Sequence, residues 1–395
     1  MDDETPPILT AVSSSARQLY QLLRCIAFSS KAHVQISAEG LKFSVDEASV
    51  MEASAFLDKS LFTTYTFHAT SPPRNSQHSD DSEDEEPDTS TTPTFQISLP
   101  ALLETLQIFG LTDPSTTKPP WARDNPYPTS TAFSNNVLGM NNLCRITYAT
   151  LGAPLSVILT EASIRTICDL TTYEPEYTDD IPFDRQSLAF KTIMRGNWLH
   201  DAISELSSTS PEKLTMYAKL IRGKSFFALT SSGTLGSARV EFNNEPQPSA
   251  YRTPAPTNTN TNTNTNNDAA ADQTPANLLE TFQLSDPDSV LKSSYKFSLV
   301  QKAARAMSVA TKVSVRVDTQ GVLSMQFMIE IEGGGGPGAG GAAGKISFVD
   351  FRFVPLVEDD EEGDGGGDGQ AGDADGDETL LQRGVGGDAG DVDMF

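Results

Sequence analysis

The 395-residue chain carries 53 acidic and 28 basic side chains, giving a formal net charge of -25. Most of the excess acid lies in residues 2–4, 74–88 and 358–395, so the rest is nearly neutral and the total charge does not exclude nucleic-acid binding. The acidic N-terminus and the lack of a long apolar run argue against a signal peptide and a membrane span, and we expect a soluble protein.

Cysteine and histidine usage gives no sign of a cofactor. The three cysteines, Cys25, Cys144 and Cys168, are widely spaced, and none belongs to a Cys-x-x-Cys pair. None of the four histidines shows the spacing of a metal site or of a nucleophile and its base. We therefore expect reduced core cysteines in an intracellular protein, with no metal and no cofactor.

Residues 13–27 predict an amphipathic helix with one basic face. The apolar stripe consists of Ala16, Leu19, Tyr20, Leu23 and either Ile26 or Ala27, and opposite it lie Arg17, Gln21 and Arg24. The alternation that follows predicts an antiparallel meander of strands. Its strands are expected at residues 33–37, 41–45, 50–56 and 61–67.

Residues 69–94 lose all periodicity, and we expect a disordered loop. Within it Ser76 precedes a glutamine, as damage-activated kinases prefer, and Ser82 precedes acids that suit an acidophilic kinase. Both serines are possible phosphorylation sites, although an unmodified solubilising loop explains the segment equally well. A strand and helix are predicted over 95–109, a second long insertion over 111–141, and strands over 143–148, 154–160 and 163–170.

After an acidic linker, the second half repeats this order. Strands are predicted at 188–194, 214–220, 225–230 and 237–242, a helix at 198–206 and a low-complexity insertion at 243–277. The helix face opposite the apolar stripe is acidic, with Asp201 and Glu205, and the first-half helix carries Glu104. Strands at 312–318, 323–331 and 346–354 follow, with a Gly-rich connection at 333–344 and a disordered acidic tail after Val357.

Between these segments, residues 295–307 read as a strand that feeds a helix, with Ser298 placed to cap it. The apolar stripe consists of Val300, Ala303, Ala304 and Met307, and Lys302 and Arg305 project from the other side. The sequence Tyr-Lys-Phe-Ser-Leu at 295–299 is similar to Phe-Gln-Ile-Ser-Leu at 95–99. The chain is therefore predicted to be an α+β protein of two duplicated domains, each with two helices packed on antiparallel sheets.

Several stretches together resemble the sliding DNA clamps of the PCNA type, and within them the Rad-one/Rec-one family, which supplies a subunit of the checkpoint 9-1-1 clamp. The stretches are Glu-Gly-Leu-Lys-Phe-Ser-Val at 39–45, Ala-Ser-Ala-Phe at 53–56, residues 95–110, Tyr-Glu-Pro-Glu at 173–176, Ala-Ile-Ser-Glu-Leu at 202–206, and residues 312–329. The resemblance implies a first clamp domain at 8–171, an interdomain connector at 172–184, a second domain at 185–357 and a tail at 358–395.

The resemblance also implies a function. Such a subunit joins two other clamp-like subunits in a heterotrimeric ring that a clamp loader places around duplex DNA at damage sites, without sequence specificity. The ring serves as a platform for checkpoint and repair proteins in the nucleus, and clients dock beside the connector. The connector lacks the Leu-Gly-Ile-Pro sequence typical of the replication processivity clamp, which favours the checkpoint clamp over that alternative.

Two sets of site residues follow from the resemblance. The four helices would line the ring channel, so Arg17, Arg24, Lys302 and Arg305, with Lys312 nearby, are predicted to contact DNA phosphates; without the resemblance, ordinary solvated helix faces would be the better interpretation. The subunit edges are predicted at residues 163–170 and 237–242. The edge residues are Ser163, Ile164, Arg165, Thr166, Ile167 and Cys168, and then Ser237, Ala238, Arg239, Val240, Glu241 and Phe242.

An enzymatic alternative arises because some members of this family carry the name of 3′ to 5′ exonucleases. Metal-dependent cleavage of a phosphodiester needs carboxylates held close together on rigid elements. Most acids here lie in predicted disordered runs, so we expect that the chain is not an enzyme. A β-rich adaptor unrelated to DNA would leave the basic helix faces and the duplication unexplained.

Overall fold

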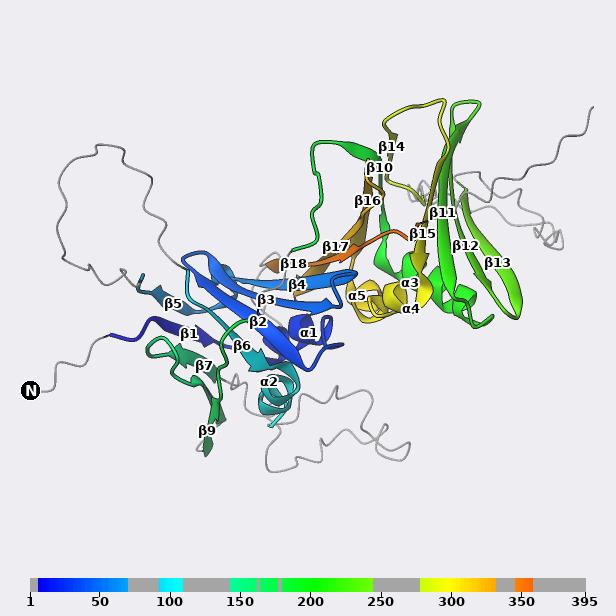
Figure 1. Ribbon diagram of the computed structural model, residues 1–395. Coiled ribbons are helices and arrows are strands. Elements are labelled where there is room, and N and C mark those ends of the chain that lie inside the picture. Colours follow the sequence, from blue (N-terminus) through cyan, green and yellow to red (C-terminus); the bar gives the residue numbers. More distant parts are fainter. Residues whose placement is uncertain are drawn as a thin grey trace, which may run out of the picture. The chain divides into compact units, whose positions relative to one another are not determined.

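The computed structural model describes residues 6–69, 92–108, 143–161, 164–176, 180–243, 278–331 and 345–357 (Figure 1). Almost all of the predicted insertions, and the whole tail after Val357, lie outside these ranges. The described residues up to Val357 belong to one compact unit. It combines helices with antiparallel sheets, which confirms the predicted α+β class.

The described residues of the first half form two α-helices and nine strands, several of them close to the predicted ranges. The elements are β1 (Leu9–Ser13), α1 (Ala16–Arg24), β2 (Lys31–Ser37), β3 (Gly40–Glu47), β4 (Met51–Asp58), the 3₁₀ turn η1 (Lys59–Leu61), β5 (Thr64–Phe67), β6 (Thr94–Ser98), α2 (Leu99–Leu106), β7 (Leu143–Tyr148), β8 (Leu155–Glu161) and β9 (Ile164–Leu170).

The second half repeats this order with one helix divided. Its elements are β10 (Leu188–Arg195), α3 (Gly196–Ser207), β11 (Lys213–Ile221), β12 (Lys224–Gly233), β13 (Gly236–Asn243), β14 (Thr281–Leu284), β15 (Leu291–Lys296), α4 (Phe297–Gln301), α5 (Ala304–Val309), β16 (Lys312–Asp318), β17 (Leu323–Ile331) and β18 (Lys345–Phe353).

Three antiparallel sheets hold these strands. A five-stranded sheet has the order β5-β1-β7-β8-β9, and a four-stranded sheet has the order β13-β12-β11-β15. The central sheet has nine strands in the order β14-β10-β16-β17-β18-β4-β3-β2-β6. Its two halves meet where β18 pairs with β4, with Val349 opposite Ala55, so the ladder is continuous across the two sequence halves (Figure 1).

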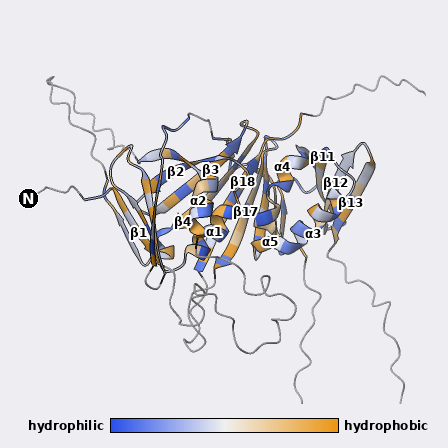
Figure 2. Ribbon diagram, turned by 90° about the horizontal axis from the view of Figure 1, so that it is seen from below, coloured by the Kyte–Doolittle hydropathy of each residue, from blue (hydrophilic) through white to orange (hydrophobic). Residues whose placement is uncertain are grey.

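Apolar residues on one face of each helix and on alternate strand positions form the core. In β16, Val313, Val315 and Val317 are buried, whereas the residues between them are half-buried. This period of two is what a strand with one covered face requires. Figure 2 shows hydrophobic and hydrophilic residues alternating along many of the strands. Helix α1 packs on β4, α2 on β2 and β6, and α3 on β10 and β12.

The predicted helix near residue 298 is wrong in two details. It begins at Phe297, and Lys296 precedes it without a side-chain cap, so Ser298 lies inside the first turn. The helix is also divided, because the amides of Lys302 and Ala303 bond three residues back, to the carbonyls of Leu299 and Val300. These tighter turns end α4 before α5 begins. At the similar sequence in the first half, a serine does cap the helix: the Ser98 hydroxyl accepts the amide of Ala101 at 3.4 Å at the start of α2.

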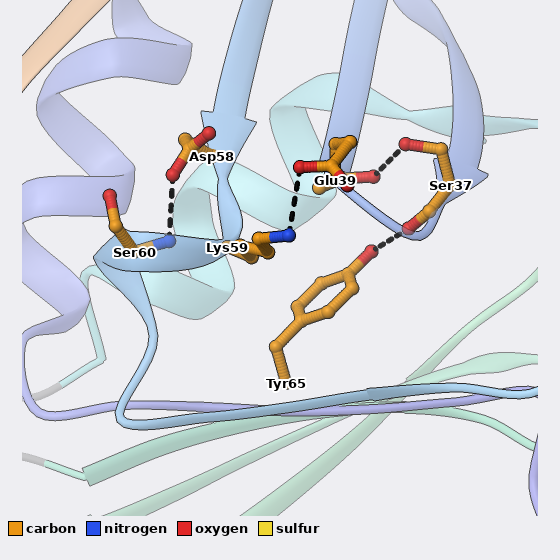
Figure 3. A network of polar contacts seen from close by, with 7 residues as sticks. Ser37, Glu39, Asp58, Lys59, Ser60 and Tyr65 are labelled. Atoms are coloured by element: carbon orange, nitrogen blue, oxygen red, sulfur yellow. Dashed lines mark hydrogen bonds and ion pairs between the residues drawn. The ribbon is translucent and has the colours of Figure 1, made fainter.

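The fourth strand of the predicted meander also differs. β2, β3 and β4 are neighbours, as expected, but β5 leaves them and pairs with β1 in the five-stranded sheet. A polar network still joins the two sheets (Figure 3). The Tyr65 hydroxyl of β5 donates to the Ser37 carbonyl of β2 at 2.7 Å, and Lys59 forms an ion pair with Glu39 at 2.8 Å.

Candidate nucleic-acid interface and subunit edges

Helix α1 presents the predicted basic face. The Ser15 hydroxyl accepts the amide of Gln18 at 3.4 Å and starts the helix, as an N-cap residue should. Because Leu19, Tyr20 and Leu23 are buried, Arg24 lies on the outer side, exposed, with its guanidinium 5.7 Å from the centre of the Tyr20 ring. Arg17 lies about two turns nearer the helix start and is half-buried.

Lys302 and Arg305 have different surroundings. The Lys302 ammonium forms an ion pair with the carboxylate of Glu47 in β3 and lies 5.5 Å from the centre of the Phe28 ring. Arg305 in α5 is exposed, and it forms no ion pair within the described ranges. The charge of Lys302 is thus partly committed to the junction of the two halves, whereas that of Arg305 points to solvent.

Two arginines from opposite halves of the chain act on the buried Cys25 thiol. Burial raises the pKa of Cys25 to about 12, and the positive charges of Arg305 and Arg24 act in the opposite direction. Arg24 and Arg305 belong to opposite halves of the chain, and both side chains are exposed.

Lys312 is less available for contact with DNA phosphates than predicted. It starts β16, and its ammonium forms an ion pair with Glu280 at 2.6 Å. Sequence reasoning missed Arg195, which lies opposite Lys312 in the β10–β16 ladder and precedes α3. Its exposed guanidinium lies 5.0 Å from the centre of the Trp198 ring. Arg195 could have been identified from the sequence as an arginine at a predicted strand-to-helix junction.

The companion helices are acidic, as predicted. Glu104 in α2 and Asp201 and Glu205 in α3 are all exposed. Their apolar neighbours are buried, because Leu102, Leu199 and Ile203 belong to the core. The described helices therefore differ in charge, with exposed basic residues on α1 and α5 and exposed acidic residues on α2 and α3.

Both predicted edge segments coincide with outermost strands. β9 ends the five-stranded sheet and β13 ends the four-stranded sheet among the described strands. Ile164 and Ile167 of β9 are 42% and 54% exposed, so apolar side chains accompany an open row of backbone groups. In β13, Arg239 forms an ion pair with Glu241 at 2.8 Å and lies 5.4 Å from the centre of the Phe226 ring. Ser163, Ser76 and Ser82 lie outside the described residues.

A cavity of about 320 Å³ lies where the predicted connector crosses β2 and β3 of the central sheet. The first part of the connector pairs with β6, where Tyr173 and Gln96 exchange two backbone hydrogen bonds of 2.9 Å. The lining is mixed, with apolar and charged side chains. It includes His33, Lys42, Val45, Met51, Pro175 and Ile181.

The cysteines and acids of the described ranges form no metal site. These ranges contain no group of three or more His, Cys, Asp and Glu side chains placed to hold a metal ion. Cys25 and Cys144 are buried and Cys168 is half-buried, all three as free thiols. No described helix combines the length and the apolar character that crossing a bilayer requires.

Comparisons with known proteins agree with this architecture. The chain is 32% identical over 352 residues to the DNA damage checkpoint control protein rad1 of Schizosaccharomyces pombe, covering 88% of this chain and 86% of that protein. It is 25% identical over 357 residues to the human cell cycle checkpoint protein RAD1, covering 90% and 95%. A more distant relative, 23% identical over 234 residues, is named DNA repair exonuclease REC1 in Mycosarcoma maydis, and only 47% of that protein is covered.

The fold matches sliding clamps of known structure. Proliferating cellular nuclear antigen from Entamoeba histolytica superposes with a TM-score of 0.53 at 11% identity, covering 89% of this chain and all of that one. PCNA from Thermococcus kodakaraensis gives a TM-score of 0.51. The predicted clamp fold is therefore confirmed. Residues 8–329 match the family described as repair protein Rad1/Rec1/Rad17, and the chain belongs to that family.

Proposed function

We propose that this chain is one subunit of a heterotrimeric, ring-shaped clamp that encircles duplex DNA at damage sites and serves as a platform for checkpoint signalling and repair. The observation that carries the proposal is the PCNA-like fold of a chain that belongs to the Rad1/Rec1/Rad17 family. Checkpoint relatives cover most of both chains, which favours this function over that of a replication processivity clamp. The site of action is the nucleus.

The basic helices would hold DNA by charge rather than by sequence. Arg24 and Arg305 are the main proposed phosphate contacts, with Arg17 beside them on α1; Lys302 and Lys312 contribute less than Arg24 and Arg305 because Glu47 and Glu280 already pair with them. Contacts to phosphates position a protein on DNA but carry no sequence information. The acidic faces of α2 and α3 would keep these contacts uneven within the subunit.

The open strands β9 and β13 are the proposed contacts with two other clamp-like subunits. An exposed strand offers unpaired N–H and C=O groups that another chain can extend. A clamp loader would place the ring on DNA, and checkpoint and repair proteins would then bind beside the connector, where the cavity lies. Ser76 and Ser82 stay proposed phosphorylation sites.

We further propose that the chain is not an enzyme. One distant relative carries the name of an exonuclease, so nuclease activity is the alternative to be tested. Support for the proposal comes from the placement of the acids on the described helices: Glu104, Asp201 and Glu205 are exposed and serve as separate surface charges. A nuclease centre would instead gather carboxylates around metal ions.

The deciding experiment is purification of the full-length chain with candidate clamp-like partners, followed by loading on closed circular and linear DNA. A clamp subunit should co-purify in equal amounts with two different partners, remain on circular DNA and slide off linear DNA. Equal retention on both topologies would contradict encirclement. Degradation of a labelled 3′ end by the purified chain alone, with Mg²⁺ or Mn²⁺, would establish the nuclease alternative.

A further inference from the structure

The last part of the connector follows one cross-strand row of the central sheet. In this row Arg316 of β16 lies opposite Ser324 of β17, which lies opposite Arg352 of β18, which in turn lies opposite Glu52 of β4. The connector lies against both ends. The Ile181 carbonyl accepts Arg352 Nη1 at 2.8 Å, and the Arg316 guanidinium lies 5.8 Å from the centre of the Phe183 ring.

This row faces away from the helices. The residues on either side of Arg316 and Arg352 in their strands, Val315, Val317, Phe351 and Phe353, are buried in the core that also holds the apolar stripes of α1 and α5. Side chains alternate between the two faces of a strand, so the arginines point to the opposite, outer face. DNA held by the helices would therefore not reach them.

Positive charge is concentrated on this outer face. Lys191 of β10 lies directly opposite Arg316, and like charges in such a pair are destabilising. Burial lowers the pKa of Arg316; Asp350 acts to raise it, and the charges of Arg185, at the end of the connector, and Arg352 act to lower it. We call Arg185, Lys191, Arg316 and Arg352 the outer basic cluster.

Two nearby carboxylates, Glu52 and Asp350, offset only part of the charge of this cluster of four basic residues. Glu52 Oε2 accepts the Ile181 amide at 3.2 Å and forms an ion pair with Arg352 Nη1 at 3.4 Å. Burial raises the pKa of Asp350, two residues before Arg352, and so disfavours its charged form, while the charge of Arg316 and a hydrogen bond with Gln326 act in the opposite direction. The Nε atom of Arg316 is buried without a hydrogen-bond partner among the described residues. Arg316 therefore keeps hydrogen-bonding capacity that the described residues do not use.

We propose that the outer basic cluster binds the phosphate group of a phosphorylated serine or threonine in a partner protein. Phosphate suits the cluster better than a carboxylate does, because it carries more negative charge at neutral pH and offers three acceptor oxygens to several guanidiniums. Recognition of phosphorylated motifs by grouped arginines is a general mode of peptide binding. The cavity beside Ile181 could hold residues that flank the phosphate.

This inference goes beyond the proposed clamp function and can fail independently of it. The probe is a degenerate nonapeptide library with phosphoserine at its centre, compared with the same library carrying serine or glutamate there. The full-length chain should bind the phosphoserine library, with an affinity roughly tenfold above that for the other two, the scale expected for one charge-assisted hydrogen bond or more.

Two variants and a matched control make the test specific. Arg185→Gln, at an exposed position, and Arg316→Gln should each lower phosphopeptide affinity about tenfold. Arg222→Gln, at an exposed position in the β11–β12 turn, should leave it unchanged. Retention on circular DNA should be the same for all three. Equal binding of the glutamate and phosphoserine libraries, or unchanged binding by the exposed Arg185→Gln variant, would overturn the proposal.

Discussion

Lys302, between α4 and α5, forms an ion pair with Glu47 at the end of β3, a residue 255 positions earlier in the sequence. The same ammonium lies over the Phe28 ring, which is itself 6.2 Å from the Phe351 ring of β18. A residue chosen from sequence as a DNA contact therefore also fastens one half of the chain to the other. Its two roles can be separated by comparison with Arg305.

Replacing Lys302 with methionine should affect folding more than DNA binding. The pair is about one-third exposed, so we expect a loss of roughly 0.2–1 kcal/mol in the free energy of unfolding. Glu47→Gln should cost a similar amount, and the double variant should cost less than the two losses added together. Arg305→Met should leave unfolding unchanged and weaken DNA retention. Chemical denaturation and retention on circular DNA measure both, and strict additivity would contradict the coupling.

Charge reversal on the basic helices should change the salt dependence of DNA retention. Each neutralised phosphate contributes about 0.9 to the log-log slope of affinity against salt concentration. A variant with glutamate at Arg17, Arg24, Lys302 and Arg305 should therefore dissociate faster and show a flatter slope, while its ring still assembles. Arg222→Glu, with the same change in charge per site, is the control. A quadruple variant with the slope of the parent would refute the channel assignment.

Proline in the two outer strands should test the subunit edges. Thr166→Pro in β9 and Ala238→Pro in β13 each remove one backbone donor and should prevent association with one partner. Successive N–H groups of a strand point in opposite directions, so at an outermost strand one points to the neighbouring strand and the next points away from the sheet. Ile167→Pro is therefore the comparison variant for Thr166→Pro. One proline of this pair should lower the stability of the monomer, and the other should abolish assembly alone. Size exclusion and thermal unfolding distinguish them; intact rings for both would exclude this edge.

Periodicity explains why most of the fold could be predicted. The stripe containing Leu19 and Leu23 places Arg24 on the opposite side of α1, because a helix that buries one face must expose the other. The same reasoning identified α2, α3 and all three strands of the β2–β4 meander. Sheet membership could not be predicted for β5, since its pairing with β1 depends on contacts distant in sequence.

Two strands were missed because they are short. β1 and β14 are only five and four residues long, which is too short for a clear alternation.

The other features that sequence reasoning missed depend on the partners of charged groups. The division of α4 from α5 falls at Lys302, which reaches Glu47 and Phe28 in the other half. The local sequence pattern around Lys302 gives no indication of partners so distant in the sequence. For the same reason, the outer basic cluster became visible only when the ladder placed Lys191 beside Arg316.

The final prediction concerns the buried carboxyl of Glu52, which links the connector to the central sheet. Burial raises the pKa of Glu52 above its ordinary value, and Arg352 and the Ile181 amide only partly offset this effect. Above pH of about 4.3, the ordinary glutamate value, the folded state therefore holds a proton that the unfolded state has released. Ionisation of this one group consequently lowers stability as the pH rises from that value through the raised pKa of the folded state.

Glu52→Gln should remove this contribution while its side-chain carbonyl still accepts the Ile181 amide. The free energy of unfolding, measured from pH 4 to 8 for parent and variant, should then show a difference that changes in favour of the variant as the pH rises. Glu176→Gln is the matched control with the opposite sign: Lys31 lowers the pKa of that carboxyl, so its stabilising contribution is lost as the pH falls. If the difference in the free energy of unfolding between the parent and Glu52→Gln stayed constant with pH, Glu52 would have the same pKa in the folded and unfolded states. Burial of its carboxyl would then not set the pH dependence of the connector attachment.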